Sequence, residues 1–260
     1  MIDISQIVSR FLGAADQAAP NCIEGLYLLG SVAFDDFVPG RSDLDLAILA
    51  TDPGDAAAAR AVEAGFRSIG GAIPAEGVLL GWDDLQQDPV TIPARPYYTA
   101  GGLQRAGRFM LDPIAWHTLA RYAAAARGPK QTEASMWCDR TALYHWTRGN
   151  LATYWTEWHR DRKSLLSYAG LAALHPRVAE WGVLGVSRLL FTLATGNLTS
   201  KTGAGLHALE TMPAQWRPIL TECLRLRRGA RHPPWAGSVW TRRTQALDYA
   251  AEAIVRGRLL

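Results

Sequence analysis

Residues 29–45 read LGSVAFDDFVPGRSDLD and connect two segments with the character of buried strands. The first segment, 25–30, is a short apolar run that ends at a glycine. The second, 43–49, alternates between acidic and apolar residues and then becomes wholly apolar. A turn that contains Pro and Gly lies between them, so this stretch predicts two neighbouring strands of one sheet.

The sequence on either side of these strands predicts further helices and one more strand. Residues 3–18 have apolar side chains at helical spacing, and 55–69 form an alanine-rich helix with Asp55 as its N-cap. Residues 73–82 have the composition of a third strand. Strand, strand, helix and strand in succession indicate a domain that combines a mixed sheet with helices.

The second half of the chain has few strand signals. Asp112 and Pro113 predict the start of a helix that continues to about Ala126, and 127–133 is the best candidate for a linker. Six further helices are expected, over 137–158, 161–173, 177–195, 201–210, 214–227 and 240–257. The predicted fold class is therefore α+β, with a mixed-sheet domain over 1–130 and a helical bundle over 131–260.

Composition limits the possible classes of protein. The chain has 260 residues, 48% hydrophobic and 20% charged, and no apolar run approaches the roughly 18 residues of a membrane span. Its three cysteines are far apart without metal-binding spacing, so we expect free thiols and a cytoplasmic protein. Residues 1–130 hold 10 Lys and Arg against 15 Asp and Glu, whereas 131–260 hold 17 against 9. The basic half could face a polyanion, or it could be a helical domain with solvated arginines.

Asp43 and Asp45 are the first candidates for chemistry. Side chains alternate along a strand, so these two carboxylates point to the same face. Adjacent carboxylates repel each other unless a cation lies between them. Mg²⁺ prefers oxygen ligands and completes its shell with water and substrate phosphates. The pair therefore predicts a Mg²⁺ site.

Gly30 and Ser31 strengthen this prediction. A glycine after a buried strand allows backbone N–H groups to approach a phosphate, and serine adds a donor. Gly-Ser, ten intervening residues and then Ser-Asp-x-Asp resembles the polymerase-beta-like nucleotidyltransferase superfamily. The resemblance implies that Asp43 and Asp45 are metal ligands and that Gly30, Ser31 and Ser42 belong to the nucleotide site.

Glu76 is the candidate for a third acid. It lies in an otherwise apolar predicted strand, where a charge is costly without a partner. Beside two metal-binding aspartates it could accept the proton of an attacking hydroxyl. The alternative is that Glu76 simply lies at the exposed start of its strand. Asp83 and Asp84 have the character of turn residues that end it.

The C-terminal half resembles a more specific family. An apolar helix with Arg188, a Thr-Ser-Lys turn at Lys201 and the segment 212–220 are similar to aminoglycoside adenylyltransferases of the streptomycin and spectinomycin type. The resemblance implies that ATP is the nucleotide and that Arg188 and Lys201 bind its phosphates. Arg188 could instead form a salt bridge with an acid.

Some features depart from that family. The position where its members present an acid to the cationic drug falls near Val178, and the nearby acid is Glu180. Residues 225–228 carry three arginines where a tyrosine is expected. In the segment 137–165, aromatic residues at helical spacing favour a core, with a stacking wall for a ligand as the alternative.

We therefore expect a nucleotidyltransferase that uses Mg²⁺ and ATP to modify a hydroxyl of an aminoglycoside. The alternative is the same chemistry on another small-molecule or protein hydroxyl. An enzyme that modifies nucleic acid and a non-catalytic nucleotide-binding protein are less favoured. We expect no nucleic-acid partner, no membrane association and a monomer.

Overall fold

The structure is a computed structural model that describes residues 3–71, 73–230 and 235–260. It divides into two compact units, Met1–Asp139 and Arg140–Leu260. The boundary expected from the sequence, after residue 130, lies nine residues before this division. The intervening segment stays with the N-terminal unit because the Trp137 N–H donates to the Leu85 carbonyl oxygen at 2.7 Å.

A six-stranded mixed sheet forms the centre of the N-terminal unit. Its strands are β1 (Gly25–Leu28), β2 (Leu44–Leu49), β3 (Ala75–Leu80), β4 (Arg95–Thr99), β5 (Gly102–Gly107) and β6 (Ala124–Arg127). Their order across the sheet is β5-β4-β3-β2-β1-β6. Only β2 and β3 pair in parallel, and the other neighbours are antiparallel. The parallel pair is connected by a helix, as a parallel connection requires.

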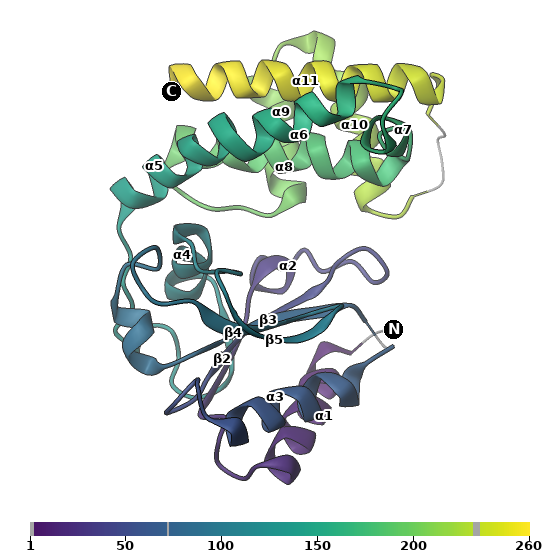
Figure 1. Ribbon diagram of the computed structural model, residues 1–260. Coiled ribbons are helices and arrows are strands. Elements are labelled where there is room, and N and C mark those ends of the chain that lie inside the picture. Colours follow the sequence, from purple (N-terminus) through teal and green to yellow (C-terminus); the bar gives the residue numbers. More distant parts are fainter. Residues whose placement is uncertain (1–2, 72, 231–234) are drawn as a thin grey trace. The chain divides into compact units, whose positions relative to one another are not determined.

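Helices cover both faces of this sheet. α1 (Ile4–Ala18) and α3 (Ala56–Ile69) lie side by side on one face (Figure 1). Leu46 and Ile48 of β2 face these helices, whereas Ala47 and Leu49 face the opposite core with α4 (Pro113–Arg121). The alternation of strand side chains therefore produces two separate cores, one on each side of the sheet.

Several predicted features of this unit are confirmed. The carboxylates of Asp55 and Asp112 cap α3 and α4 by accepting backbone N–H groups. The helix expected to reach Ala126 instead ends at Arg121, because residues 124–127 pair with β1 as an edge strand. β4 and β5 were also not expected, since their polar, glycine-flanked sequences lack a long apolar run.

The C-terminal unit is helical within its described residues. Its helices are α5 (Arg140–Asn150), a π-helical turn (Leu151–Trp155), α6 (Thr156–Lys163), α7 (Tyr168–Ala172), α8 (Pro176–Thr195), α9 (Lys201–Thr211), a 3₁₀ turn (Ala214–Trp216), α10 (Arg217–Arg227) and α11 (Val239–Leu259). α8 contacts α9, α10 and α11 and forms the centre of the bundle. The observed α+β fold, a mixed sheet with helices followed by a helical bundle, confirms the predicted class.

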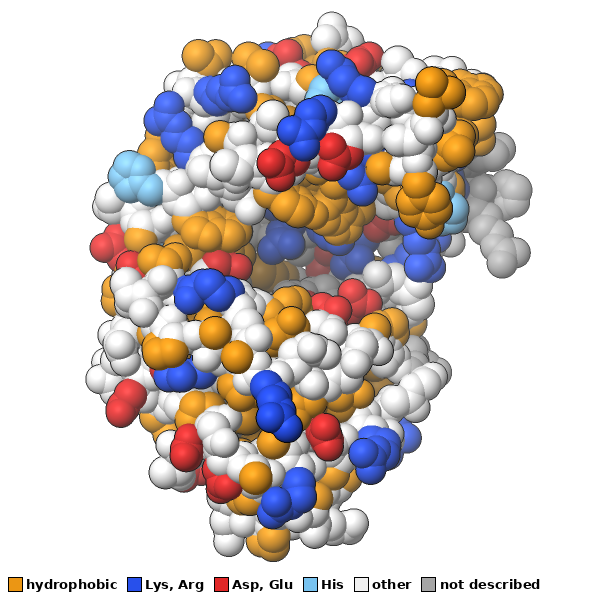
Figure 2. Space-filling view, in the orientation of Figure 1, with side chains coloured by type: hydrophobic (Ala, Val, Ile, Leu, Met, Phe, Trp, Pro, Cys, Tyr) orange, Lys and Arg blue, Asp and Glu red, His pale blue; other side chains and the backbone are white. Residues whose placement is uncertain are grey.

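By length and composition, α8 is the one helix among the described residues that could cross a membrane. However, 56% of the tested stretch is buried inside the unit, as is usual for the central helix of a bundle. Figure 2 shows Lys and Arg side chains at separate places on one face of the helical unit, with Asp and Glu side chains among them.

Aromatic rings pack on α8 through two glycines. The rings of Trp155, Trp158 and Trp181 have centroids 4.7–5.8 Å apart. A Cβ at Gly182 would lie 2.3 Å from Trp158, and one at Gly185 would lie 2.3 Å from Trp155. Trp155 and Trp158 are buried, so their packing favours the core interpretation of the aromatic segment.

Buried charges connect the remaining helices of this unit. The Glu222 carboxylate, whose side chain is 2% exposed, accepts from Arg225 at 2.7 and 2.9 Å and lies 3.6 Å from Arg242. The Arg243 guanidinium donates to the carbonyl oxygens of residues 162, 163 and 170. Some arginines of the C-terminal half therefore stabilise the packing of the helices. They do not all lie solvated on its surface.

Candidate active site

The two aspartates lie at the start of β2. Asp43 is exposed and immediately precedes the strand, and half-buried Asp45 is its second residue. Asp45 alternates with Leu44 and Leu46, so its side chain lies on the sheet face of α4. The Leu29 N–H donates to the Asp45 carbonyl oxygen at 2.9 Å, which ties the end of β1 to this position.

Gly30 and Ser31 lie directly against Asp45. Gly30 has φ +54°, and a Cβ at this position would meet Asp45 Oδ2. Only glycine allows the backbone to pass this close to the carboxylate. Ser31 Oγ is buried and has no hydrogen-bond partner among the described residues. A buried hydroxyl without a partner is costly, and a bound ligand oxygen would satisfy it.

Ser42 has a structural contact in the same loop. It is buried, and its Oγ accepts a hydrogen bond from the Val38 N–H at 3.0 Å. The Ser42 N–H donates in turn to the Val38 carbonyl oxygen at 2.9 Å. These bonds close the turn that leads into Asp43 and fix where that aspartate begins the strand.

Glu76 is brought beside the aspartates by the parallel pairing of β2 and β3. Its Cα is the register partner of Asp45, and the side chain is half-buried. Burial raises the pKa of Glu76, and the negative charge of Asp43 raises it further. A carboxyl with a raised pKa is better matched to accepting a proton near neutral pH. Glu76 is therefore not a fully exposed residue at the start of its strand, and it lies close to another carboxylate.

Asp83 and Asp84 lie beyond the opposite, C-terminal end of β3. The buried Asp84 carboxylate accepts from Arg95 at 2.6 and 2.8 Å and from the Gly81 N–H at 2.8 Å. These bonds agree with its expected role at the end of a strand. Asp83 lies beside it in the short 3₁₀ turn Trp82–Gln86.

Asp43 and Glu76 line a cavity of ≈ 440 Å³ in the N-terminal unit. Phe66 and Tyr98 also line it, and their rings stack at 3.9 Å between centroids. The sequence analysis did not single out these two aromatic residues. The two consecutive tyrosines in β4 could have indicated an aromatic wall here, but β4 itself was not predicted from the sequence.

The donor set is consistent with Mg²⁺. No group of three His, Cys, Asp or Glu side chains among the described residues is arranged to hold a metal ion by itself. Mg²⁺ is commonly bound by one or two carboxylates together with substrate phosphates, so a pair of aspartates beside a partnerless hydroxyl fits it. Asp43 and Asp45 are the residues that would hold it.

Arg188 and Lys201 belong to the C-terminal unit. Arg188 is half-buried on α8, and half-buried Lys201 is the first residue of α9. Ser200 caps α9 by accepting the Gly203 N–H at 3.0 Å. The structure thus brings Gly30, Ser31, Asp43, Asp45 and Glu76 together in the N-terminal unit, and Arg188 and Lys201 are elements of the helical unit.

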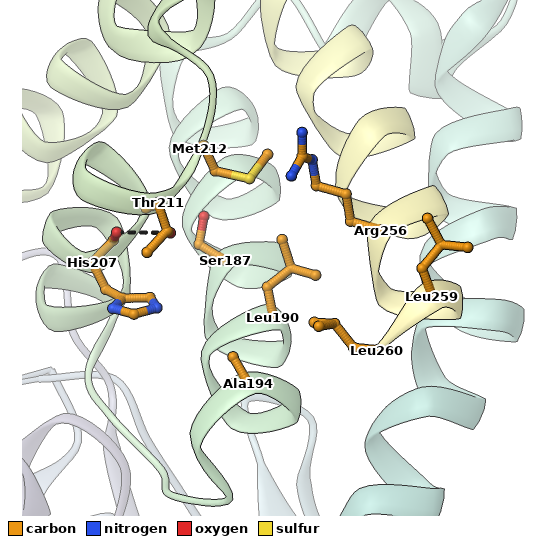
Figure 3. A pocket seen from close by; sticks show the side chains of 10 residues that line it. Ser187, Leu190, Ala194, His207, Thr211, Met212, Arg256, Leu259 and Leu260 are labelled. Atoms are coloured by element: carbon orange, nitrogen blue, oxygen red, sulfur yellow. Dashed lines mark hydrogen bonds between the residues drawn. The ribbon is translucent and has the colours of Figure 1, made fainter.

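A second cavity, of ≈ 270 Å³, lies within the helical unit (Figure 3). It is lined mainly by apolar side chains of α8, α9 and α11, among them Leu190 and Leu259. Ser187 Oγ at its wall lies 2.7 Å from the Tyr249 hydroxyl. Arg188 and Lys201 are not part of its lining, so this cavity is separate from the candidate phosphate-binding residues.

Comparison with known proteins identifies the type of domain. Residues 172–252 match the family described as the aminoglycoside adenylyltransferase C-terminal domain. No curated protein sequence matches the chain. A solved structure, spectinomycin adenyltransferase AAD(9) from Enterococcus faecialis with ATP and spectinomycin, is similar with a TM-score of 0.69. The likeness covers 96% of this chain and 98% of that one at 14% sequence identity, and it concerns the fold.

Residues 172–252 therefore form a domain of the aminoglycoside adenylyltransferase C-terminal type, as the resemblance predicted, and the whole chain has a fold similar to that of AAD(9).

Proposed function

We propose that this enzyme transfers AMP from ATP to a hydroxyl of an aminoglycoside-type antibiotic in a Mg²⁺-dependent reaction. The observation that carries the proposal is the register pairing of Asp45 with Glu76 beside Gly30. The N-terminal ends of the two central strands thereby supply metal ligands and a candidate base. AAD(9), with its similar fold, was solved with ATP and spectinomycin, which supports the choice of reactants.

Each residue has a distinct task in the proposed reaction. Asp43 and Asp45 hold Mg²⁺, which when bound neutralises negative charge on the triphosphate. Ser31 donates its free hydroxyl to a phosphate oxygen, with Gly30 and Ser42 shaping the loop. Glu76 accepts the proton of the acceptor hydroxyl while that oxygen attacks the α-phosphorus. The bond from the α-phosphorus to the bridging oxygen breaks, and pyrophosphate leaves.

Arg188 and Lys201 complete the proposed site as cations that bind the triphosphate. In this proposal the N-terminal domain supplies the chemistry and the helical domain supplies phosphate binding. The enzyme acts as a monomer on small molecules in the cytoplasm. The scattered Lys and Arg side chains on the face in Figure 2 favour this over a nucleic-acid substrate.

The test of the base is Glu76→Gln, which keeps the shape of the side chain and removes its ability to take a proton. We expect AMP transfer, measured by mass spectrometry on a panel of aminoglycosides, to fall by about 100- to 10,000-fold. Binding of Mg·ATP, measured by calorimetry, should change little. Glu63→Gln, on exposed α3, is the matched control. Near-normal transfer by Glu76→Gln would exclude Glu76 as the base.

A second candidate is the same transfer to a different hydroxyl, on another small molecule or a protein. Glu180, the acid near the family's drug-binding position, is 6% exposed in the helical unit. A buried acid is poorly placed to attract a polycationic drug. Thermal-shift measurements with Mg·ATP and each aminoglycoside separate the candidates. Stabilisation by none of them would favour the second.

A further inference from the structure

The cavity of ≈ 270 Å³ in the helical unit has no role in the proposed reaction. Apolar side chains of three helices line it, among them Leu190 of α8, Ala208 of α9 and Leu259 of α11. Figure 3 shows the side chains of Leu190 and Met212 extending into the space between these helices. An apolar cavity of about 150 Å³ can hold one benzene molecule. The larger space here therefore suits a molecule of two fused rings.

The cavity is open to solvent, and its wall at the end of α11 is held in place. Ala194 and Leu260 at its rim are exposed, so a small molecule can enter. The Tyr144 hydroxyl of α5 donates to the Leu260 carbonyl oxygen at 2.9 Å. The Arg148 guanidinium, also of α5, donates to the Arg258 carbonyl oxygen at 2.9 Å. A ligand therefore does not have to order this turn in order to bind, and a preformed site costs less entropy to occupy.

The hydroxyl groups at the wall already have protein partners. Ser187 Oγ donates to the Val183 carbonyl oxygen at 2.7 Å and lies 2.7 Å from the Tyr249 hydroxyl. The Thr211 hydroxyl donates to the His207 carbonyl oxygen at 2.9 Å (Figure 3). A buried water typically makes about three hydrogen bonds, and water in this cavity would find few partners. An apolar ligand is therefore the better occupant.

The charge at the wall is also compensated. Arg256 is the one Lys, Arg, Asp or Glu among the described residues that line the cavity. Its Nε–H donates to the Glu252 carboxylate at 2.7 Å, one turn earlier on α11. A charged ligand would lose water in the cavity without gaining a free counter-charge, which is costly. The ligand is therefore expected to be uncharged.

His207 and Met212 are the side chains suited to recognising an aromatic ligand. The half-buried His207 ring packs edge-on against Phe191, with centroids 5.1 Å apart. Within the part of the chain that the structure describes, the His207 ring nitrogens form no hydrogen bond. In a neutral imidazole one nitrogen accepts, so it can bind an N–H or O–H group of a ligand. The Met212 thioether favours contact with an aromatic ring.

We propose that this cavity is a binding site for a small, uncharged molecule of two fused aromatic rings with a single N–H or O–H group. The rings lie among the Leu190, Ala208 and Met212 side chains, and the N–H or O–H group donates to the His207 ring. The candidate residues of nucleotide transfer do not line the cavity, so this proposal does not depend on the proposed reaction.

The test uses indole, an uncharged probe with two fused rings and one N–H group. The full-length protein is labelled with ¹³C at the methyl groups of its four methionines, and indole is titrated while their NMR signals are followed. Met212 lines the cavity, whereas Met110 and Met136 belong to the N-terminal unit. We expect a saturable shift of the Met212 signal and no shift of the other two. No saturable shift at Met212, or equal shifts at all three, overturns the proposal.

Variants then locate the probe. Ala194→Leu adds bulk at the exposed rim and should weaken indole binding by about 10-fold or more. Ala56→Leu makes the same change at an exposed position of α3 and should leave the affinity unchanged. Unchanged binding by Ala194→Leu, or equal losses in both variants, contradicts binding in this cavity.

The hydrogen bond is tested at His207. His207→Phe keeps a ring and removes the acceptor, so indole binding should weaken by about fivefold. N-methylindole, which has no N–H group, should bind the parent and this variant alike. Equal losses for both probes would overturn the role of His207 as acceptor.

Discussion

The two units hold their candidate functional residues in different ways. In the N-terminal unit, Asp43, Asp45 and Glu76 are positioned by strand alternation and by a single register between β2 and β3. In the helical unit, Arg188 and Lys201 stand on helices whose places depend on a core of tryptophans, glycines and buried ion pairs. The first site depends on the pairing of two strands, and the second depends on many contacts among several helices.

Because of this difference, we expect substitutions in the two units to affect different properties of the protein. A change at the N-terminal ends of β2 and β3 should impair chemistry while the fold persists, because few residues define the site. A change in the helical core should reduce the free energy of unfolding before it affects any particular function. Four substitutions test this contrast, and the first three each have a control substitution in the same unit.

The largest effect is expected from Glu222→Gln in the helical unit. The change leaves the Arg225 and Arg242 guanidinium groups without a compensating charge around a buried position. We expect the free energy of unfolding, measured by urea denaturation, to fall by about 3 kcal/mol or more. Glu210→Gln, at an exposed position of α9, is the control and should change the free energy of unfolding little. Equal stability of the two variants would show that the buried network does not hold the helices.

Gly30→Ala should have the next effect, on activity. Both Gly30 and Gly40 have positive φ, but only at Gly30 would the new Cβ collide with Asp45. Displacing that carboxylate should lower the rate of AMP transfer by about 100-fold. Gly40→Ala faces open space and should show only the modest backbone cost of its conformation. Comparable activity in both variants would mean that the contact with Asp45 is not needed.

Gly185→Ala should have a smaller effect, on stability. The added methyl would lie 2.3 Å from the Trp155 ring, so the buried aromatic residues must shift. We expect a loss of about 1–3 kcal/mol. Gly149→Ala on α5 meets no atom within 4 Å and should stabilise the unit by about 0.5–1 kcal/mol, since alanine favours helix. Opposite signs in thermal unfolding would confirm the tight packing on α8.

The smallest effect concerns the ion pair between Asp16 and Arg127. The hydrogen bond from Arg127 lowers the pKa of Asp16, so the ionised form is favoured in the folded state. Its contribution is present above the ordinary pKa of aspartate and is lost as the pH falls through the lowered value. Because both side chains are partly exposed, Asp16→Asn should cost less than about 1 kcal/mol near pH 7. The difference from the parent should vanish at low pH, and a difference that persists there would contradict an electrostatic origin.

The sequence predicted the first three strands, both helix caps and the gathering of Asp43, Asp45 and Glu76, because alternation and capping are local. It missed β4, β5 and β6, whose pairing depends on partners far away in the chain. Short polar strands such as β6 carry little periodic signal and are fixed by their neighbours. The stack of Phe66 on Tyr98 was missed for the same reason. Spacing along the chain does not report contacts between distant segments.

The π-helical turn at Leu151–Trp155 sets the rotational phase between α5 and α6. Directly after it, the Thr156 hydroxyl donates to the Leu151 carbonyl oxygen at 3.1 Å. Removing a single residue from this turn would replace it with regular α-helical winding and change the direction in which the following side chains face. The tryptophans of this segment would then turn away from the glycines of α8. The length of this turn therefore determines which side chains of α6 face α8. Insertions or deletions here would disturb the bundle far more than changes in a surface loop.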